Sequence, residues 1–180
     1  MSKLQRTSIR IGTFNCNHRL TPGTQGRSVL AHVLCCMSKK SAKIAALIDG
    51  YRGQEMDAHY LGYFECFNRT LFYEAHDVLE ELWLSNRQGP NYSFYKGLIQ
   101  LAGAFVHLQK NRLRPSSALF KLAQANLQKY PAVHERLDVA QTLRLIADWL
   151  RQIESSDFAV NPLTPSNAPR LELLLAAPPL

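Results

Sequence analysis

The chain has 180 residues, of which 46% are hydrophobic, and a formal net charge of +7. This length suits one globular domain with some chain to spare, and it can bury a core without disulfides or metal ions. No apolar run approaches the roughly 18 to 20 residues that a membrane-spanning helix needs, so we expect no membrane span.

The positive charge is concentrated at the start of the chain. Residues 1–48 contain eight Lys and Arg and no acidic residue, whereas residues 49–180 contain thirteen basic and fourteen acidic residues. A nearly neutral body offers no source for a basic groove that could neutralise several phosphates. We therefore expect no nucleic-acid partner.

Residues 1–45 show no sustained hydrophobic period and hold turn signals at Pro22-Gly23 and Gly26. They predict a basic, disordered leader, or an extension added by an upstream start-site error; an acid-free segment of this kind can also be an organelle transit peptide. A short helix is expected between a Ser38 cap and a Gly50 stop.

The cysteine pattern indicates reduced thiols. The four cysteines form no CxxC pair and no spacing typical of structural zinc or of a secreted disulfide framework: Cys16, Cys35, Cys36 and Cys66. The simplest interpretation is a cytoplasmic protein.

The body, expected at 46–155, follows a helical period and contains no long alternating run of β-branched residues. The fold class is therefore all-α, and short connections predict an up-and-down bundle of about five helices. The helix at 93–111 is apolar on nearly all sides and should be central. The five helices are expected at about 54–67, 69–86, 93–111, 115–130 and 134–154.

Residues 156–180 hold five of the nine prolines and cannot continue a helix. We expect a Pro-rich tail that contributes little to folding. A chain running from Met37 to about Ser156 should then keep its thermal midpoint within a few degrees.

The stretch LFYEAHDVLEELWL, residues 71–84, combines an apolar helical face with one histidine and four carboxylates. On a wheel of about 100° per residue, Glu74, Asp77 and Glu81 fall together on a solvated side. His76 and Glu80 are one turn apart at the edge of the apolar arc. Such a pair can bind a divalent metal or orient a general base, but it can equally be a plain hydrogen bond on a half-buried shoulder.

The central helix offers further polar partners. Gln100 and His107 share one stripe with Gly103 between them. In one interpretation this stripe is simply where the helix meets solvent. In the other, Gly97, Gly103 and Ala104 allow a neighbouring helix to come close, which brings Gln100 and His107 toward His76 and Glu80.

The segments FNRTLFYEAHDVLEELW and FYKGLIQLAGAFVHLQKNRLRPSSALFKLAQANL together resemble domain-of-unknown-function family 309, a small bacterial and archaeal helical family, from about Tyr60 to Tyr130. The resemblance implies a compact helical bundle without an established biochemical role, whose members are sometimes labelled metal-dependent hydrolases. The positions that carry the resemblance are Phe67, Asn68, Tyr73, Glu74, His76, Glu80, Trp83, Gly97, Gln100 and His107.

Two functional hypotheses stand. The first, slightly favoured, is a non-catalytic interaction or oligomerisation module, with a second copy of the chain as one kind of partner, in which the His, Glu and Gln side chains form a satisfied polar network. The second is a metal-dependent hydrolase that uses His76, Glu80 and His107 as zinc or manganese ligands or as acid–base groups. There Gln100 would orient the substrate, while Tyr73 and Trp83 would shape an apolar wall.

Overall fold

A computed structural model of the protein describes residues 39–175, and these residues belong to one compact unit. The expectations for the leader, the Ser38 cap and the first three cysteines lie outside the described residues. The elements of the described part are α2 (Lys39–Ile48), a short 3-10 turn η2 (Asp49–Tyr51), α3 (Ala58–Asn68), α4 (Phe72–Ser85), α5 (Tyr92–Gln109), α6 (Leu113–Leu127), β1 (Val133–His134), β2 (Leu137–Asp138) and α7 (Val139–Ser155).

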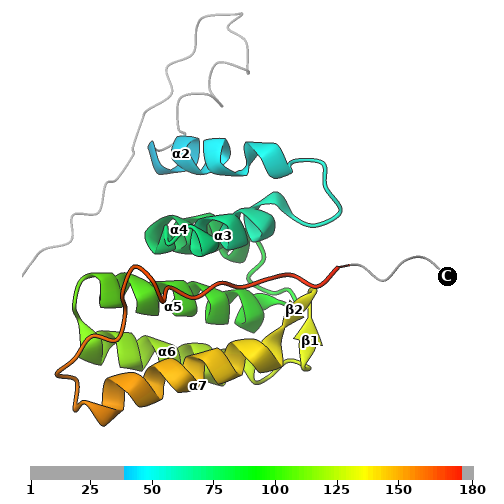
Figure 1. Cartoon of the computed structure of the whole chain (residues 1–180). Coiled ribbons are helices and arrows are strands. Elements are labelled where there is room, and N and C mark those ends of the chain that lie inside the picture. The colour runs from blue at the N-terminus through cyan, green and yellow to red at the C-terminus, as the bar shows by residue number, and fades with distance from the viewer. Residues whose placement is uncertain (1–38, 176–180) are drawn as a thin grey trace, which may run out of the picture. The chain divides into compact units, whose positions relative to one another are not determined.

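The predicted all-α fold is confirmed. Successive helices pack as neighbours, and α5 lies between the α3–α4 pair and the α6–α7 pair (Figure 1). Ten side chains or glycines of α5 are buried, so the central position expected from its apolar sequence is also confirmed. No helix within residues 39–175 is both long and apolar enough to cross a bilayer.

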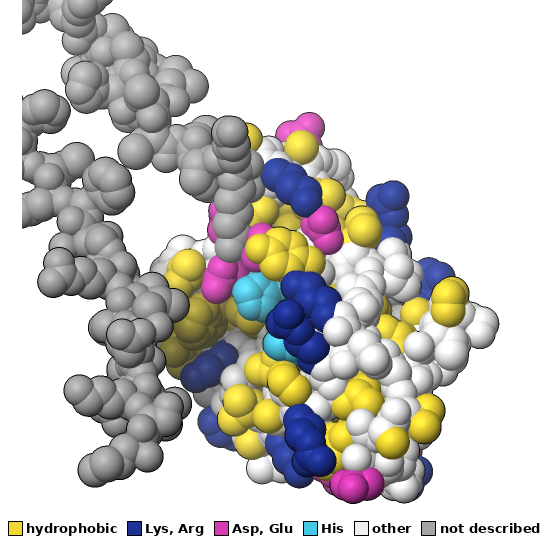
Figure 2. Space-filling model, turned by 90° about the vertical axis from the view of Figure 1, so that its left-hand side faces the viewer, with side chains coloured by type: hydrophobic (Ala, Val, Ile, Leu, Met, Phe, Trp, Pro, Cys, Tyr) yellow, Lys and Arg dark blue, Asp and Glu magenta, His cyan; other side chains and the backbone are white. Residues whose placement is uncertain are grey.

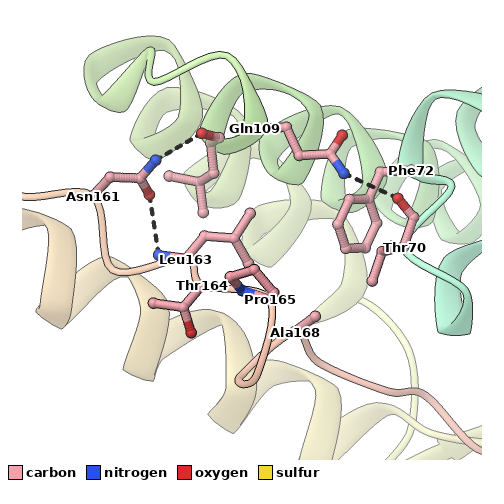
Figure 3. A pocket seen from close by; sticks show the side chains of 9 residues that line it. Thr70, Phe72, Gln109, Asn161, Leu163, Thr164, Pro165 and Ala168 are labelled. Carbon is pink, nitrogen blue, oxygen red and sulfur yellow. Dashed lines mark hydrogen bonds between the residues drawn. The ribbon is translucent and has the colours of Figure 1, made fainter.

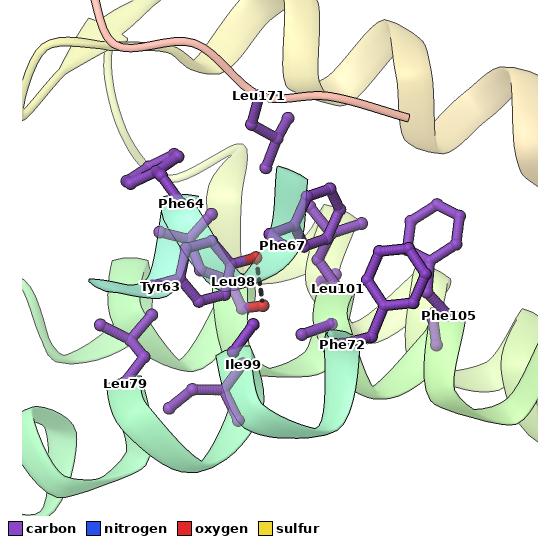
Figure 4. Close-up of a cluster of buried hydrophobic side chains, with 14 of the residues drawn as sticks. Tyr63, Phe64, Phe67, Phe72, Leu79, Leu98, Ile99, Leu101, Phe105 and Leu171 are labelled. Carbon is purple, nitrogen blue, oxygen red and sulfur yellow. Dashed lines mark hydrogen bonds between the residues drawn. The ribbon is translucent and has the colours of Figure 1, made fainter. Parts of the chain in front are cut away.

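The core is built largely from aromatic rings. Phe72 of α4 stacks on Phe105 of α5 at 4.9 Å between ring centroids, and Phe67 of α3 meets both rings edge-on (Figure 4). The buried Tyr63 hydroxyl donates to the Leu98 carbonyl at 2.9 Å, which gives its polar atom a partner. These contacts fix α4 against α5, the two helices that carry the candidate site.

The predicted helix at 134–154 begins later than expected. Residues 133–138 form a two-stranded hairpin, with Val133 paired to Asp138 and His134 paired to Leu137. Glu135 and Arg136 at its tip have φ values of 48° and 61°, a turn that favours Asn and Gly but is here made by two long side chains. The expectation of no strand was wrong at this hairpin, and α7 starts only after it, where the Asp138 carboxylate accepts from the Gln141 N–H.

Helix α2 is part of the folded body. It packs on α3 and α4, and Ile44 and Ile48 are buried in the core. The helix expected between residues 38 and 50 is therefore present. The predicted domain start at residue 46 falls inside this helix.

The Pro-rich segment after α7 is not helical, but it packs along the bundle as far as Leu174. The side-chain amide of Asn68 in α3 donates to the Leu171 carbonyl and accepts from the Leu171 N–H, each at 2.8 Å. Leu171 is buried, and Leu173 pairs with Leu137 of the hairpin. These contacts argue against the expectation that the chain could end near Ser156 without a loss of stability.

Candidate functional site on helices α4 and α5

His76, Asp77 and Glu80 place their ligand-type atoms together on one side of α4. The His76 Nδ1 and the Asp77 Oδ1 are 3.2 Å apart, and one atom from each of the three residues lies within 4.8 Å of the other two. Positions i, i+1 and i+4 of a helix share a side closely enough for this to happen. Glu80 is thus within the expected one-water reach of His76, although the direct contact of His76 is with Asp77.

The acidic side of α4 was predicted to be open to solvent, but it is partly covered in the structure. The side chain of Asp77 is only 14% exposed, and Glu74 accepts an ion-paired hydrogen bond from Lys43 of α2 at 2.8 Å. That bond lowers the pKa of Glu74 below its ordinary value. The wheel placed these carboxylates correctly, but α2 covers this side of the helix.

Helix α5 faces the same group of side chains. A Cβ built on Gly103 would lie 3.9 Å from the His76 Cδ2, an ordinary van der Waals distance, so the imidazole lies against α5 at this position. Lys110 lies over the Tyr73 ring at 6.0 Å. Because the chain directions are opposite, His107, which lies between Gly103 and Lys110, faces the turn of α4 between His76 and Tyr73.

We call Tyr73, His76, Asp77, Glu80 and His107 the α4–α5 face. Figure 2 shows histidine side chains on one surface of the molecule, with Lys or Arg on one side of them and carboxylates on the other. The surface therefore presents imidazole groups between charges of opposite sign.

His107 has an unusual environment. Its Nδ1 is buried without a hydrogen-bond partner in the described part of the chain. Burial lowers the pKa of His107 below its ordinary value, and the nearby charges of Arg112 and Lys110 lower it further. Both effects favour the neutral form of this imidazole.

Residues 60–119 match the family model described as Domain of unknown function (DUF309). This segment, one third of the chain, is similar to the DUF309 family. The match confirms the resemblance found in the sequence, although it ends before Tyr130; it runs from α3 into α6 and contains every residue of the α4–α5 face. No curated protein and no solved structure matches the chain.

Two of the predicted site residues of the DUF309 segment lie away from this face. The Gln100 Oε1 accepts a hydrogen bond of 2.8 Å from Asn126 of α6, where Gly97 allows Leu127 to come close. Trp83 packs on Tyr92 with ring centroids 5.2 Å apart, near the other end of α4. The single polar network expected from His76, Glu80, Gln100 and His107 is therefore not formed as one unit.

A second polar cluster joins the DUF309 segment to the hairpin at 133–138 and was missed in the sequence. We call Asn91, Tyr95, His134 and Glu135 the hairpin end. Asn91 contacts the His134 Nε2 at 2.8 Å and donates to Glu135 at 2.6 Å, while the His134 ring packs on Phe94 at 4.8 Å. Asp77 was also given too little weight as a site residue, because its angle on the wheel gave no sign that it would be mostly buried.

Proposed function

We propose that the DUF309 domain is a non-catalytic binding module that holds one divalent cation, zinc or manganese, through His76, Asp77 and Glu80. The observation that carries the proposal is the convergence of three ligand-type atoms within 4.8 Å on α4. Imidazole nitrogen and carboxylate oxygen are ligands that both metals accept. Three protein ligands leave a position for water or for a group from a partner, such as a second copy of the chain.

The donor chemistry fits such an ion. The half-buried Asp77 carboxylate already lies beside the imidazole, so one negative charge is held close to the ligand nitrogen. A cation entering there would replace the contact between His76 and Asp77 with two metal bonds. It would also reduce the mutual repulsion of Asp77 and Glu80.

A non-catalytic role is supported by the separation of the groups that a hydrolase would need together. Gln100 binds Asn126, and Trp83 packs against Tyr92 at the other end of α4. A cavity of about 410 Å³ lies nearby, but among the described residues that line it none belongs to the α4–α5 face. Gln100, which would orient the substrate, and Trp83, which would shape the apolar wall, thus lie apart from each other and from the ligand group on α4.

The metal-dependent hydrolase is kept as a second candidate because of His107. Its Nδ1 is buried without a hydrogen-bond partner among the described residues, and burial lowers the pKa of the imidazole. A neutral histidine beside a metal-bound water is a suitable general base. Under this hypothesis His107 would accept a proton from that water, and His76, Asp77 and Glu80 would hold the ion.

Melting curves test the cation site. With zinc or manganese at 100 times the dissociation constant, the wild-type domain should gain about 2.7 kcal/mol over its value in chelator. Glu80→Gln should lose this gain and change the stability in chelator by less than about 1 kcal/mol. Glu81→Gln, on the next position of the same helix, is the matched control and should keep the full gain.

Wild-type curves that coincide in chelator, zinc and manganese would refute the cation site. Hydrolysis of a phosphate or carboxylate ester that needs added metal and disappears in both Glu80→Gln and His107→Gln would establish the hydrolase instead. A metal-dependent gain without any hydrolysis is the result we expect.

We also propose a cytoplasmic location, because the described thiol is of the inert, reduced kind. Cys66 is free and buried, and burial raises its pKa to about 11. Fractionation of cells that express the chain would test this. Recovery with the membrane or secreted fraction would contradict it.

A further inference from the structure

The cavity of about 410 Å³ lies where the C-terminal segment crosses the ends of α4 and α5. Figure 3 shows side chains from three parts of the chain around it: Phe72 at the start of α4, Gln109 at the end of α5, and Leu163 and Pro165 from the C-terminal segment. This volume falls in the range of about 300–1,000 Å³ that small-molecule sites occupy.

The outer wall of the cavity is built without help from a ligand. The Asn161 amide donates to the Leu108 carbonyl at 2.8 Å and accepts from the Leu163 N–H at 3.0 Å. Asn167 closes the loop by donating to the Pro162 carbonyl and accepting from the Thr164 N–H, each at 2.8 Å. A wall that is already ordered costs a ligand little conformational entropy on binding.

The opposite wall is held in the same way. Gln109 donates to the Thr70 carbonyl at 3.0 Å across the gap between α5 and the α3–α4 turn. Thr70 has a φ of 60°, a left-handed conformation that is uncommon for a β-branched residue. The turn thus presents the Thr70 carbonyl to Gln109, and both residues line the cavity.

The chemistry of the lining selects the kind of ligand. The polar side chains are all neutral: Thr70, Gln109, Asn161 and Thr164. The remaining lining is apolar: Phe72 and Leu108 of the buried core lie beneath the cavity, and Leu163, Pro165 and Ala168 form its wall. Among the described residues that line the cavity none is charged, so an ionised ligand would lose hydration there without gaining a counter-charge.

We propose that this cavity binds an uncharged small molecule that combines a flat apolar ring with a neutral hydrogen-bonding group such as an amide. The ring would lie against the Leu163–Pro165 wall, above the buried Phe72 and Leu108, and the polar group would meet the Gln109 amide or the Thr164 hydroxyl. The site is separate from the proposed cation site, and neither proposal depends on the other.

The experiment uses benzamide and benzoate, which share a ring and nearly a shape but differ in charge. Amide resonances of the full-length chain are followed while either probe is added. Benzamide should give saturable shifts at Thr70, Leu163 and Ala168, with a dissociation constant in roughly the millimolar range. Benzoate should bind at least tenfold more weakly.

Two cavity variants and one control variant locate the binding. Ala168→Phe extends a ring from the cavity wall and should weaken benzamide binding at least tenfold, whereas Ala125→Phe, the same change on the exposed side of α6, should not. Thr164→Val removes one hydroxyl with little change in size and should weaken binding severalfold. It serves as the test if Ala168→Phe proves poorly folded. Absence of saturable shifts, equal or tighter binding of benzoate, or binding that all three variants leave unchanged would each overturn the proposal.

Discussion

The α4–α5 face and the hairpin end both place histidines among polar groups, but they satisfy them differently. At the hairpin end, partners come from different elements: Asn91 at the start of α5 binds His134 of β1 and Glu135 of the turn. The Tyr60 hydroxyl of α3 also donates to the Glu135 carbonyl at 3.0 Å. On the α4–α5 face, the His76 Nδ1 contacts the carboxylate of its chain neighbour Asp77, and the His107 Nδ1 has no partner within the described residues.

This difference separates structural polar groups from groups available for binding. Hydrogen bonds between elements hold the fold together, because breaking one leaves a desolvated group behind on another element. The contact of His76 with Asp77 joins chain neighbours within one helix, so it adds little to the packing of the helices. We therefore expect the hairpin end to determine stability and the α4–α5 face to determine the response to metal.

The largest effect should come from removing the C-terminal segment, which packs on α3 and pairs with Leu137 of β2. A chain ending at Ser156 loses the buried Leu171, both Asn68 bonds and the pairing of Leu173 with Leu137. Burial of one leucine contributes about 1.5–3 kcal/mol, and each hydrogen bond contributes about 0.5–1.5 kcal/mol. The free energy of unfolding should fall by at least about 3 kcal/mol, with a drop in thermal midpoint of roughly 10 °C.

A chain ending at Leu175 is the control, since it keeps every contact described for this segment and should melt with the full chain. Equal midpoints for the Ser156 and Leu175 chains would show that the segment does not stabilise the bundle.

A matched pair of histidine substitutions tests the comparison directly. His134→Ala removes the bond to Asn91 and the packing on Phe94, and it should lower the free energy of unfolding by about 1–3 kcal/mol. His76→Ala, measured in chelator, removes a one-third exposed side chain and should cost less than about 1 kcal/mol. Denaturant titrations give both values, and equal costs would remove the distinction between the two regions.

The sequence was sufficient for the helices but not for the segments between and after them. The central position of α5 follows from its apolar character on all sides, which is a property of many residues together. The hairpin depends on two residues with positive φ, and the C-terminal segment depends on individual amide bonds from Asn68 and Asn161. Such specific contacts leave no periodic signal, so a pattern of hydrophobic residues could not predict them.

The candidate site was predictable to a similar degree. The pairing of His76 with Glu80 on one side of α4 follows directly from helical geometry. The contribution of Asp77 was given too little weight, because its burial depends on tertiary packing, which the helical wheel does not show. Gln100 was assigned to the wrong neighbour for the same reason: its position on α5 is fixed by the helix, but the partner is determined by which helix Gly97 allows to come close.

The smallest expected effect concerns the pH dependence contributed by His107. Its pKa in the folded protein is lowered by burial and by the charges of Arg112 and Lys110, whereas in the unfolded chain it should be close to the ordinary value of about 6.5. As the pH falls below this value, the unfolded state takes up the proton first, so the folded state is progressively disfavoured. The loss is complete once the pH passes below the lowered pKa, and no loss occurs at higher pH.

His107→Gln should remove this loss, because a neutral amide replaces the imidazole at similar size. In chelator, the wild-type free energy of unfolding should therefore fall more between pH 7.5 and pH 5 than that of the variant, and the other titrating groups cancel because both chains carry them. Denaturant titrations at several pH values measure the difference. If the two curves stayed parallel, His107 would not be held neutral by the fold, and the α4–α5 face would not differ from the hairpin end in the way that its unpaired Nδ1 indicates.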